Sequence, residues 1–218
     1  MSPEYMVRRR SDFHLTGPSV WLDENSAMPS TDLITARGSP INTLLAHFFC
    51  TGRNASQSVI IVNKLSGKAL EVENSSSNQG ARIQQFTRNG TSNQRWFVKC
   101  TKFIKYRAFP GMIRHRVLRF WPTLLPLPQA GYSLIADHSG LCLDVLNIST
   151  DNAVAVQQLP LNRGKNQLWG FAPDNEGFNF IINLHSGEVL EVAEIKNCAP
   201  VRQYPFNGGD NQRWQLFH

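Results

Sequence analysis

The 218-residue chain is poor in charged residues, which make up 17% of it, and in cysteine, of which it has four. It contains no run of about 18 apolar residues, so we expect no membrane-spanning helix. The four scattered cysteines are too few for a disulfide framework and form no paired Cys-x-x-Cys metal motif. Residues 8–10 are basic but no apolar stretch follows them, so the sequence predicts no standard signal peptide.

What the chain does contain is an internal repeat. The motif Asn-Gln-x-Trp occurs at residues 93–96, 166–169 and 211–214. Upstream of each copy lies Ser-Gly and then Leu-(Asp/Glu)-Val, whose leucine precedes the tryptophan by 26, 26 and 24 residues. Three ordered motifs at nearly equal spacing indicate three copies of one structural unit.

Each copy is predicted to consist of short strands. Apolar runs at residues 59–62, 132–135 and 180–182 precede the Ser-Gly turns, and further short runs are separated by turns rich in Gly, Asn and Ser. No segment of the copies shows the 3.6-residue periodicity of a helix. The pattern predicts an all-β protein with a closed architecture.

These motifs resemble the ricin B-type lectins, whose units of similar length each end in Gln-x-Trp. The resemblance covers residues 57–99, 131–173 and 178–218, which we call the first, second and third repeats. It implies a β-trefoil of three four-stranded repeats in which the three motif tryptophans anchor the core. One unit is too small to bury its own apolar face, whereas three can share a core.

The segments without the motifs divide the chain further. We expect a ricin B-type trefoil domain at residues 57–218, interrupted by an insertion at 101–130 between the first and second repeats. Residues 1–56 match no repeat and are expected to form a poorly structured N-terminal extension.

The candidate sites follow from the chemistry of sugars, which offer hydroxyls and an apolar C–H face. Such a ligand suits a carboxylate, amides and an aromatic platform. The resemblance implies that these come from the Leu-(Asp/Glu)-Val acid, a glutamine and an aromatic on the next strand, and the Asn-Gln pair. The matching positions are Glu71, Gln84, Phe86, Asn93 and Gln94 in the first repeat, Asp144, Gln157, Asn166 and Gln167 in the second, and Glu191, Tyr204, Asn211 and Gln212 in the third.

Two repeats depart from the pattern of the family. Leu159 stands where the second repeat needs its aromatic, and Arg202 replaces the glutamine of the third repeat. We expect Arg202 to be able to pair with Glu191 and occlude that carboxylate. Relatives often hold a disulfide at the position of Cys142, but its partner position falls near Leu161, so we expect an unpaired, buried thiol.

The first repeat has every chemical type, although its glutamate is one methylene longer than the usual aspartate. We therefore rank the candidate sites first, second, third. A structural interpretation stands beside this one. The recurring glutamines can serve the fold alone, the acids can be solvated carboxylates at strand edges, and the aromatics can be partly packed.

The function expected from these features is a non-catalytic carbohydrate-binding (lectin) module with shallow sites on its repeats, whose partner is a carbohydrate or glycoconjugate. The alternative is a β-trefoil protein-interaction or inhibitor module with degenerate sugar sites.

The repeats contain no nucleophile elbow or phosphate loop, and their acids occupy equivalent places instead of facing one another as a catalytic pair. We expect no enzyme activity, no cofactor and no metal. The resemblance suggests an extracellular location, with membrane contact only through glycans.

The formal charge of +6 arises from one segment. Residues 1–56 hold five basic and five acidic side chains, residues 101–130 hold six basic and no acidic ones, and the remainder holds eleven of each. With its aromatics, the 101–130 segment resembles a nucleic-acid-binding or membrane-binding strip, but prolines interrupt it. An alternative is that residues 101–130 and much of 1–52 are translated non-coding sequence, since 122–130 and 47–52 can be encoded by pyrimidine tracts of splice-acceptor form. We expect no nucleic-acid partner and poor packing of both segments.

Overall fold

The computed structural model describes residues 57–103 and 130–218. These residues form twelve β-strands and five 3₁₀ turns. The strands are β1 (Val59–Asn63), β2 (Ala69–Val72), β3 (Ile83–Phe86), β4 (Arg95–Phe103), β5 (Ala130–Ala136), β6 (Cys142–Val145), β7 (Val156–Leu159), β8 (Trp169–Pro173), β9 (Asn179–Asn183), β10 (Val189–Val192), β11 (Ala199–Tyr204) and β12 (Arg213–Phe217). The 3₁₀ turns are η2 (Glu73–Ser75), η3 (Ser92–Gln94), η4 (Leu146–Ile148), η5 (Lys165–Gln167) and η6 (Asp210–Gln212).

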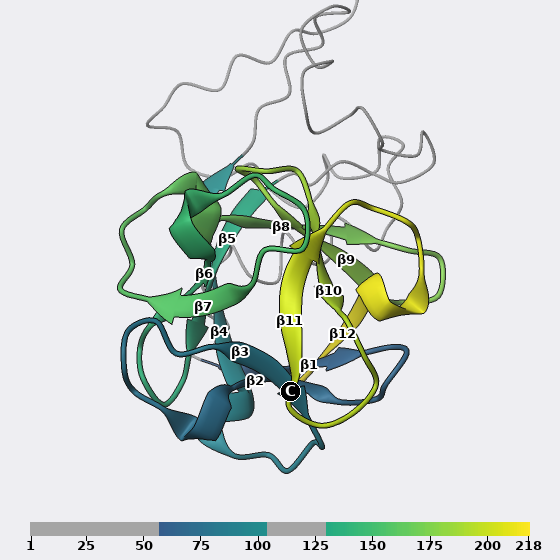
Figure 1. Ribbon diagram of the computed structural model, residues 1–218, viewed down its shortest axis with the longest axis horizontal. Helices are drawn as coiled ribbons and strands as arrows, with labels where there is room; N and C mark the ends of the chain where they lie inside the picture. The colour runs from purple at the N-terminus through teal and green to yellow at the C-terminus, as the bar shows by residue number, and fades with distance from the viewer. Residues whose placement is uncertain (1–56, 104–129) are drawn as a thin grey trace, which may run out of the picture. The chain divides into compact units, whose positions relative to one another are not determined.

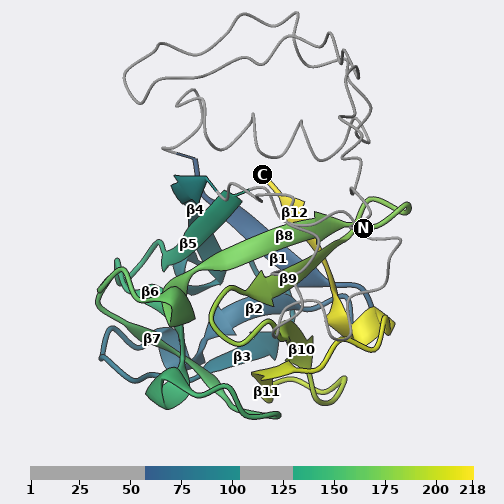
Figure 2. The same cartoon turned by 90° about the horizontal axis from the view of Figure 1, so that it is seen from above.

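Six of the strands close into an antiparallel ring. β1 pairs with β4 and β12, β5 pairs with β4 and β8, and β9 pairs with β8 and β12. The order of strands around this ring can be followed in Figures 1 and 2. Closure leaves each of these strands paired on both sides, which protects the edges of the sheet. The prediction of an all-β fold is confirmed.

The remaining six strands form three hairpins, β2–β3, β6–β7 and β10–β11. Their second strands, β3, β7 and β11, come together in the middle of the view in Figure 1. The pairs that join one hairpin to another are Ala199 with Gln85, Pro200 with Gln84, Arg82 with Gln157, and Ala155 with Arg202. Each hairpin therefore places the beginning of its second strand beside the residue of another hairpin that pairs with the acid: Gln84, Gln157 or Arg202.

The core is centred on the tryptophans of the Asn-Gln-x-Trp motifs. Trp96, Trp169 and Trp214 are fully buried, as predicted for core anchors. Each indole Nε1 donates a hydrogen bond to the carbonyl of the leucine in Leu-(Asp/Glu)-Val, at 3.0, 3.1 and 2.9 Å. Since side chains alternate along a strand, the leucine and valine of that motif face the core and the acid between them faces the other way.

The strands extend beyond the boundaries expected for the insertion. β4 continues to Phe103 and β5 begins at Ala130, and these two residues are opposite one another in the pairing. Ala130 is buried in the core cluster, so apolar burial holds it in the strand. Residues 101–103 and 130 thus belong to the β4–β5 hairpin, while 104–129 and the 1–56 extension lie outside the described residues. In the described part, no helix has the length and apolar character needed to cross a membrane.

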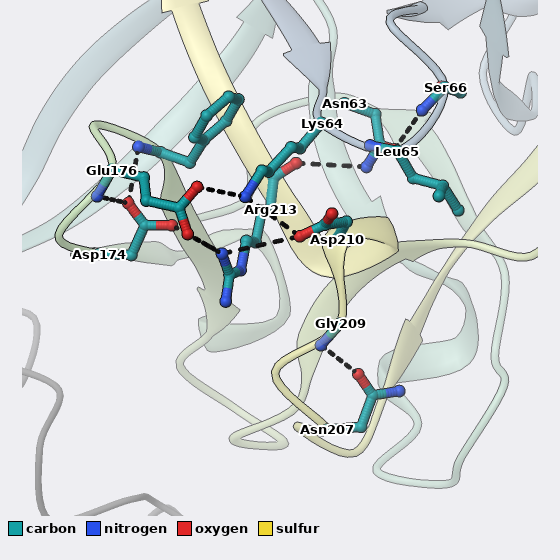
Figure 3. A network of polar contacts seen from close by, with 11 residues as sticks. Asn63, Lys64, Leu65, Ser66, Asp174, Glu176, Asn207, Gly209, Asp210 and Arg213 are labelled. Atoms are coloured by element: carbon teal, nitrogen blue, oxygen red, sulfur yellow. Dashed lines mark hydrogen bonds and ion pairs between the residues drawn. The ribbon is translucent and has the colours of Figure 1, made fainter.

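A charged network lies where the first and last strands meet (Figure 3). Lys64 Nζ lies 2.6 Å from Glu176 Oε2 and 3.2 Å from Asp210 Oδ1, and Arg213 Nη1 lies 2.9 Å from Glu176 Oε1. The network joins the β1–β2 turn, the β8–β9 turn and η6. Exposed ion pairs of this kind contribute little, so closure of the ring depends on strand pairing and the core.

Candidate functional site

The acids of the three Leu-(Asp/Glu)-Val motifs are buried, with exposed fractions between 1% and 5%. Each accepts a hydrogen bond from the glutamine of its Asn-Gln-x-Trp motif, which lies on a 3₁₀ turn. The bonds run from Gln94 to Glu71 at 2.7 Å, from Gln167 to Asp144 at 3.0 Å and from Gln212 to Glu191 at 2.9 Å. The same amide nitrogens also donate to backbone carbonyls. These glutamines therefore hold both the acid and the adjoining loop.

In the first site, Glu71 has partners at both oxygens. Gln84 donates to Oε1 at 2.9 Å and Gln94 donates to Oε2. Asn93 Nδ2 donates to the carbonyl of Val72 at 3.1 Å, and the Thr91 hydroxyl lies 2.6 Å from Asn93 Oδ1. The carboxylate and both ends of the Asn93 amide are therefore engaged within the chain.

The second site leaves one acceptor unfilled. Gln157 donates to Asp144 Oδ1 at 3.1 Å, while Asn166 and Gln167 donate to Oδ2 at 2.6 and 3.0 Å. Asn166 is 1% exposed, yet its Oδ1 has no hydrogen-bond partner among the described residues. Burial raises the pKa of Asp144, and the three amide donors offset only part of that effect.

In the third site, Arg202 closes off the acid, as we expected. Its guanidinium donates from Nε and Nη2 to Glu191 Oε1, at 3.1 and 2.9 Å. The guanidinium carbon also lies 4.8 Å from the centre of the Tyr204 ring. One arginine therefore covers both the carboxylate and the aromatic platform.

A single position on the loop before each 3₁₀ turn distinguishes the first site from the other two. Thr91 occupies it in the first, where its hydroxyl also lies 2.6 Å from Asn89 Oδ1. In the second it is Gly164, and a Cβ there would collide with Asn166 Oδ1. In the third it is Gly209, and a Cβ there would lie 2.6 Å from Asn211 Oδ1. The glycine of the second site thus makes room for the Asn166 amide, whose nitrogen reaches Asp144.

The platform positions lie two residues beyond the strand residue that pairs with the acid. Phe86 follows Gln84, Leu159 follows Gln157 and Tyr204 follows Arg202. Side chains two apart on a strand share a face, so each platform is on the same face as its acid. All three are partly exposed.

The loop that connects β2 and β3 of the first hairpin is polar. Arg82 Nε lies 3.1 Å from Glu73 Oε2, and the two residues line a cavity of about 430 Å³ together with Asn74, Asn78 and Gln79. Arg82 is also the residue that pairs with Gln157 of the second site.

The family model described as ricin-type beta-trefoil lectin domain-like matches residues 47–107, 121–204 and 165–218, more than half of the chain. The chain belongs to this family. The resemblance to the ricin B-type lectins that the motifs indicated is therefore confirmed. Among curated proteins, none matches the chain.

Solved structures of this ricin-type fold extend the comparison. The designed threefold-symmetric protein ThreeFoil is 32% identical, with a TM-score of 0.60, and the match covers 74% of this chain and 98% of ThreeFoil. The exo-β-1,3-galactanase of Clostridium thermocellum is 26% identical with a TM-score of 0.59, but the match to 74% of this chain covers only 30% of the enzyme. The Rhizoctonia solani agglutinin is 20% identical with a TM-score of 0.55, over 73% of this chain and 93% of the agglutinin, which supports the fold alone.

The described cysteines of this ricin-type chain include one buried thiol. Cys142 is free and buried, as predicted, and burial raises the pKa of its thiol to about 12. Leu161, at the expected partner position, is 40% exposed. Among the described residues, no group of three or more His, Cys, Asp or Glu side chains is arranged to hold a metal ion.

Sequence reasoning missed a second set of glutamines that joins the repeats of this ricin-type fold. Gln85, Gln158 and Gln203 are fully buried, and each accepts from a Ser-Gly serine within its own repeat. Each amide nitrogen donates to two carbonyls in the loop of another repeat. The signal available was the Gln-Gln pair at 84–85 and 157–158, in which one glutamine faces the acid and the next faces the neighbouring loop.

Proposed function

We propose that the chain is a non-catalytic carbohydrate-binding module that recognises sugar hydroxyls. In this proposal residues 57–218 form a β-trefoil of three four-stranded repeats, with the 101–130 insertion after the first and the 1–56 extension before it. The observation that supports the function best is the buried, unpartnered Oδ1 of Asn166 beside Asp144.

In this proposal a sugar hydroxyl supplies the donor that Asn166 Oδ1 lacks, once the groups that bury this oxygen move aside. A buried acceptor without a partner costs about 1–3 kcal/mol, which a ligand recovers on binding. A second hydroxyl reaches Asp144 Oδ1 by displacing Gln157, which is partly exposed and makes the longest of the three amide bonds to this acid, 3.1 Å. Vicinal hydroxyls suit this pair of acceptors.

This argument places the second site ahead of the first, the reverse of the order expected from sequence. In the first site, Thr91 takes the role that we assign to the ligand, because its hydroxyl lies beside Asn93 Oδ1. In the third site, Arg202 occupies the acid. We therefore expect the second site to be the main sugar site of each chain.

Galactosides are the first probes to use. The Macrolepiota procera ricin B-like lectin, solved in complex with lactose, has a TM-score of 0.53 to this chain. It is 15% identical over 74% of this chain and 95% of the lectin, so it suggests a ligand class and not a site. Since a single shallow site binds weakly, a glycan array that presents many copies of each sugar suits a first screen.

The test is binding of the full chain to a glycan array and titration with lactose, followed by Asp144→Ala and the matched Glu71→Ala. We expect at least a tenfold loss of affinity for Asp144→Ala and less than a twofold change for Glu71→Ala. Because Asp144→Ala removes the acceptor of three amides, of which, in the described part of the chain, Gln167 alone keeps another in the carbonyl of Pro160, Asn166→Ala provides a second variant, and circular dichroism checks the fold of each. Undiminished binding by folded Asp144→Ala and Asn166→Ala would contradict the site.

The alternative is a protein-interaction module, and one observation favours it for the first and third sites. In the first site the Thr91 hydroxyl lies at Asn93 Oδ1, and in the third site Arg202 pairs with Glu191, so neither site offers a sugar the acceptor that the second site leaves unfilled. A protein partner whose binding free lactose and free monosaccharides fail to compete would support this alternative.

The similarity to the galactanase does not extend the proposal to catalysis. The chain spans less than a third of that enzyme. The acids of this chain are held by amides or by an arginine on separate hairpins, an arrangement that suits binding. We expect no hydrolysis of aryl galactosides by the purified chain, and turnover abolished by Asp144→Ala would contradict this expectation.

A further inference from the structure

The second site has an apolar surface directly beside its acid. On the outer face of the β6–β7 hairpin, Asp144 pairs with Gln157, and just past the end of the paired strands Leu146, the first residue of η4, lies opposite Ala155. The backbone N–H of Leu146 donates to the carbonyl of Ala155 at 3.2 Å, which continues the strand register past the end of β6. Since side chains two apart share a face, Leu146 lies one step along from Asp144.

The first site has an ion pair at the equivalent place. Glu71 pairs with Gln84, and the next pair is Glu73 with Arg82, held by a backbone bond of 3.0 Å. There the two side chains form the 3.1 Å ion pair described above. The same backbone thus presents charge beside one acid and hydrocarbon beside the other.

The apolar surface of the second site is exposed. Leu146 is 37% exposed, and Ile148, two residues further on, is 56% exposed. Ile148 also has a φ of +55°, a region that β-branched residues rarely adopt. The corresponding residue of the first repeat, Ser75, has nearly the same φ, 51°, with a small polar side chain.

These observations separate two kinds of ligand. A ligand that donates hydroxyls to Asp144 and Asn166 brings whatever its ring carries at the neighbouring carbon against Leu146 and Ile148. A hydroxyl there loses water without gaining a partner, whereas a methyl group buries apolar surface. In the first site, where the ion pair of Glu73 and Arg82 replaces this apolar surface, a methyl group on the ligand gains no such contact.

We propose that the second site selects sugars that carry an apolar substituent, such as the methyl of an acetamido group, through contact with Leu146 and Ile148. This inference rests on the proposed function, in which the second repeat binds the sugar. Burial of one methyl group contributes about 0.8 kcal/mol, which corresponds to about a fourfold preference over the unsubstituted sugar.

The experiment uses pairs of probes that differ in one group: N-acetylgalactosamine against galactose, and N-acetylglucosamine against glucose. The full chain is titrated with each by NMR, and the ratio of the two dissociation constants is compared with that of Leu146→Glu/Ala155→Arg. This double variant transfers the ion pair of the first hairpin to the second. The matched control, Glu73→Leu/Arg82→Ala, makes the reverse change on the first hairpin.

We expect a preference of about fourfold for at least one acetamido sugar in the native chain. In Leu146→Glu/Ala155→Arg we expect the ratio of the two dissociation constants to fall to about one, while the affinity for the unsubstituted sugar changes less than twofold. In the control, Glu73→Leu/Arg82→Ala, we expect the preference of about fourfold to persist. A ratio unchanged by the transfer, in a variant with native circular dichroism, would overturn the inference while leaving sugar binding intact. Absence of binding to all four sugars and to the glycan array would overturn the proposed function and this inference with it.

Discussion

Arg202 donates two hydrogen bonds to one carboxylate oxygen of Glu191, from Nε at 3.1 Å and from Nη2 at 2.9 Å. At the same position the first and second repeats carry Gln84 and Gln157, each of which gives its acid one bond. The charged, bidentate donor is much harder for a neutral sugar to displace than an amide. The third repeat therefore keeps the framework of a binding site while its acid is occupied from within.

Arg202→Gln is expected to open this site. The substitution restores the amide found in the other repeats, so we expect the lactose stoichiometry from calorimetry to rise by about one per chain. Arg202→Ala is the contrasting variant. It leaves the buried Glu191 without its charged partner, which costs about 3–5 kcal/mol when a buried pair is broken, less here because Arg202 is partly exposed. Unchanged stoichiometry in a well-folded Arg202→Gln protein would show that the arginine is not what closes the site.

Gly164→Ala is expected to weaken sugar binding at the second site by about tenfold, which is about 1.4 kcal/mol. The new Cβ collides with Asn166 Oδ1, so the amide must turn away from the position in which it reaches Asp144. The backbone of Gly164, with a φ of −64°, accepts alanine without strain, so the fold is retained. Gly209→Ala makes the same change in the third repeat and is expected to leave binding unchanged. Equal effects of the two substitutions on lactose affinity would contradict the assignment.

Gln158→Ala is expected to destabilise the fold by about 2–4 kcal/mol. The side chain is fully buried, accepts from Ser139 at 2.8 Å and donates to the carbonyls of Ser76 and Asn78 at 2.7 and 2.9 Å. Its removal takes away the Ser139 acceptor and one donor from each of two loop carbonyls of the first repeat, which keep His138 Nε2 at 2.9 Å from Ser76 O and the Ala81 N–H at 3.3 Å from Asn78 O. The measurement is the free energy of unfolding in urea. The matched control is Gln79→Ala on the exposed part of that loop, for which we expect a change below about 0.5 kcal/mol.

The local features of this fold could be predicted from the sequence because they depend on short spacing. Alternation along Leu-(Asp/Glu)-Val determines which side chains enter the core, and the third-repeat pairing of Arg202 with Glu191 follows from two residues on adjacent strands. The bonds of Gln158 could not be predicted in this way, because its partners are backbone carbonyls about 80 residues away in another repeat.

The occupancy of the sites also lay beyond sequence reasoning. Thr91 and Gly164 are loop residues that belong to no motif, yet they determine whether the neighbouring asparagine keeps a free acceptor. The burial of Asp144 arises from the turn that folds over it, which contributes Asn166 and Gln167 from more than 20 residues further along the chain. The ranking from residue types alone placed the first site highest, because residue types carry no information about these contacts.

Glu188→Gln is expected to change the pH dependence of stability. Burial, with the nearby charges of Asp151 and Glu191, raises the pKa of Glu188 from its usual 4.5 to about 7. The folded chain holds this proton more tightly than the unfolded chain, so the contribution of Glu188 to stability is largest below pH 4.5 and falls as pH rises to about 7. Relative to native, we expect Glu188→Gln to gain about 1–2 kcal/mol between pH 4.5 and 7.5 in urea unfolding.

The control for this pH effect is Glu194→Gln, because the Glu194 side chain is 51% exposed and pairs with Lys196 on the surface. We expect the difference between Glu194→Gln and native to stay within about 0.5 kcal/mol across the same pH range. A gain that is the same at pH 4.5 and pH 7.5 for Glu188→Gln would mean that its carboxyl does not titrate in this window.

Ile148→Asn is expected to raise stability while lowering the preference for acetamido sugars. Asparagine tolerates the positive φ at this position, so the substitution relieves strain worth about 1 kcal/mol in urea unfolding. The same change removes the exposed hydrocarbon that we assign to the ligand, so we expect the fourfold preference to fall by about half. Ala153, which also has a positive φ and is exposed, gives the control. Ala153→Asn should gain stability in the same way without any change in preference, and a loss of preference there too would indicate that loop strain, and not the isoleucine side chain, determines selectivity.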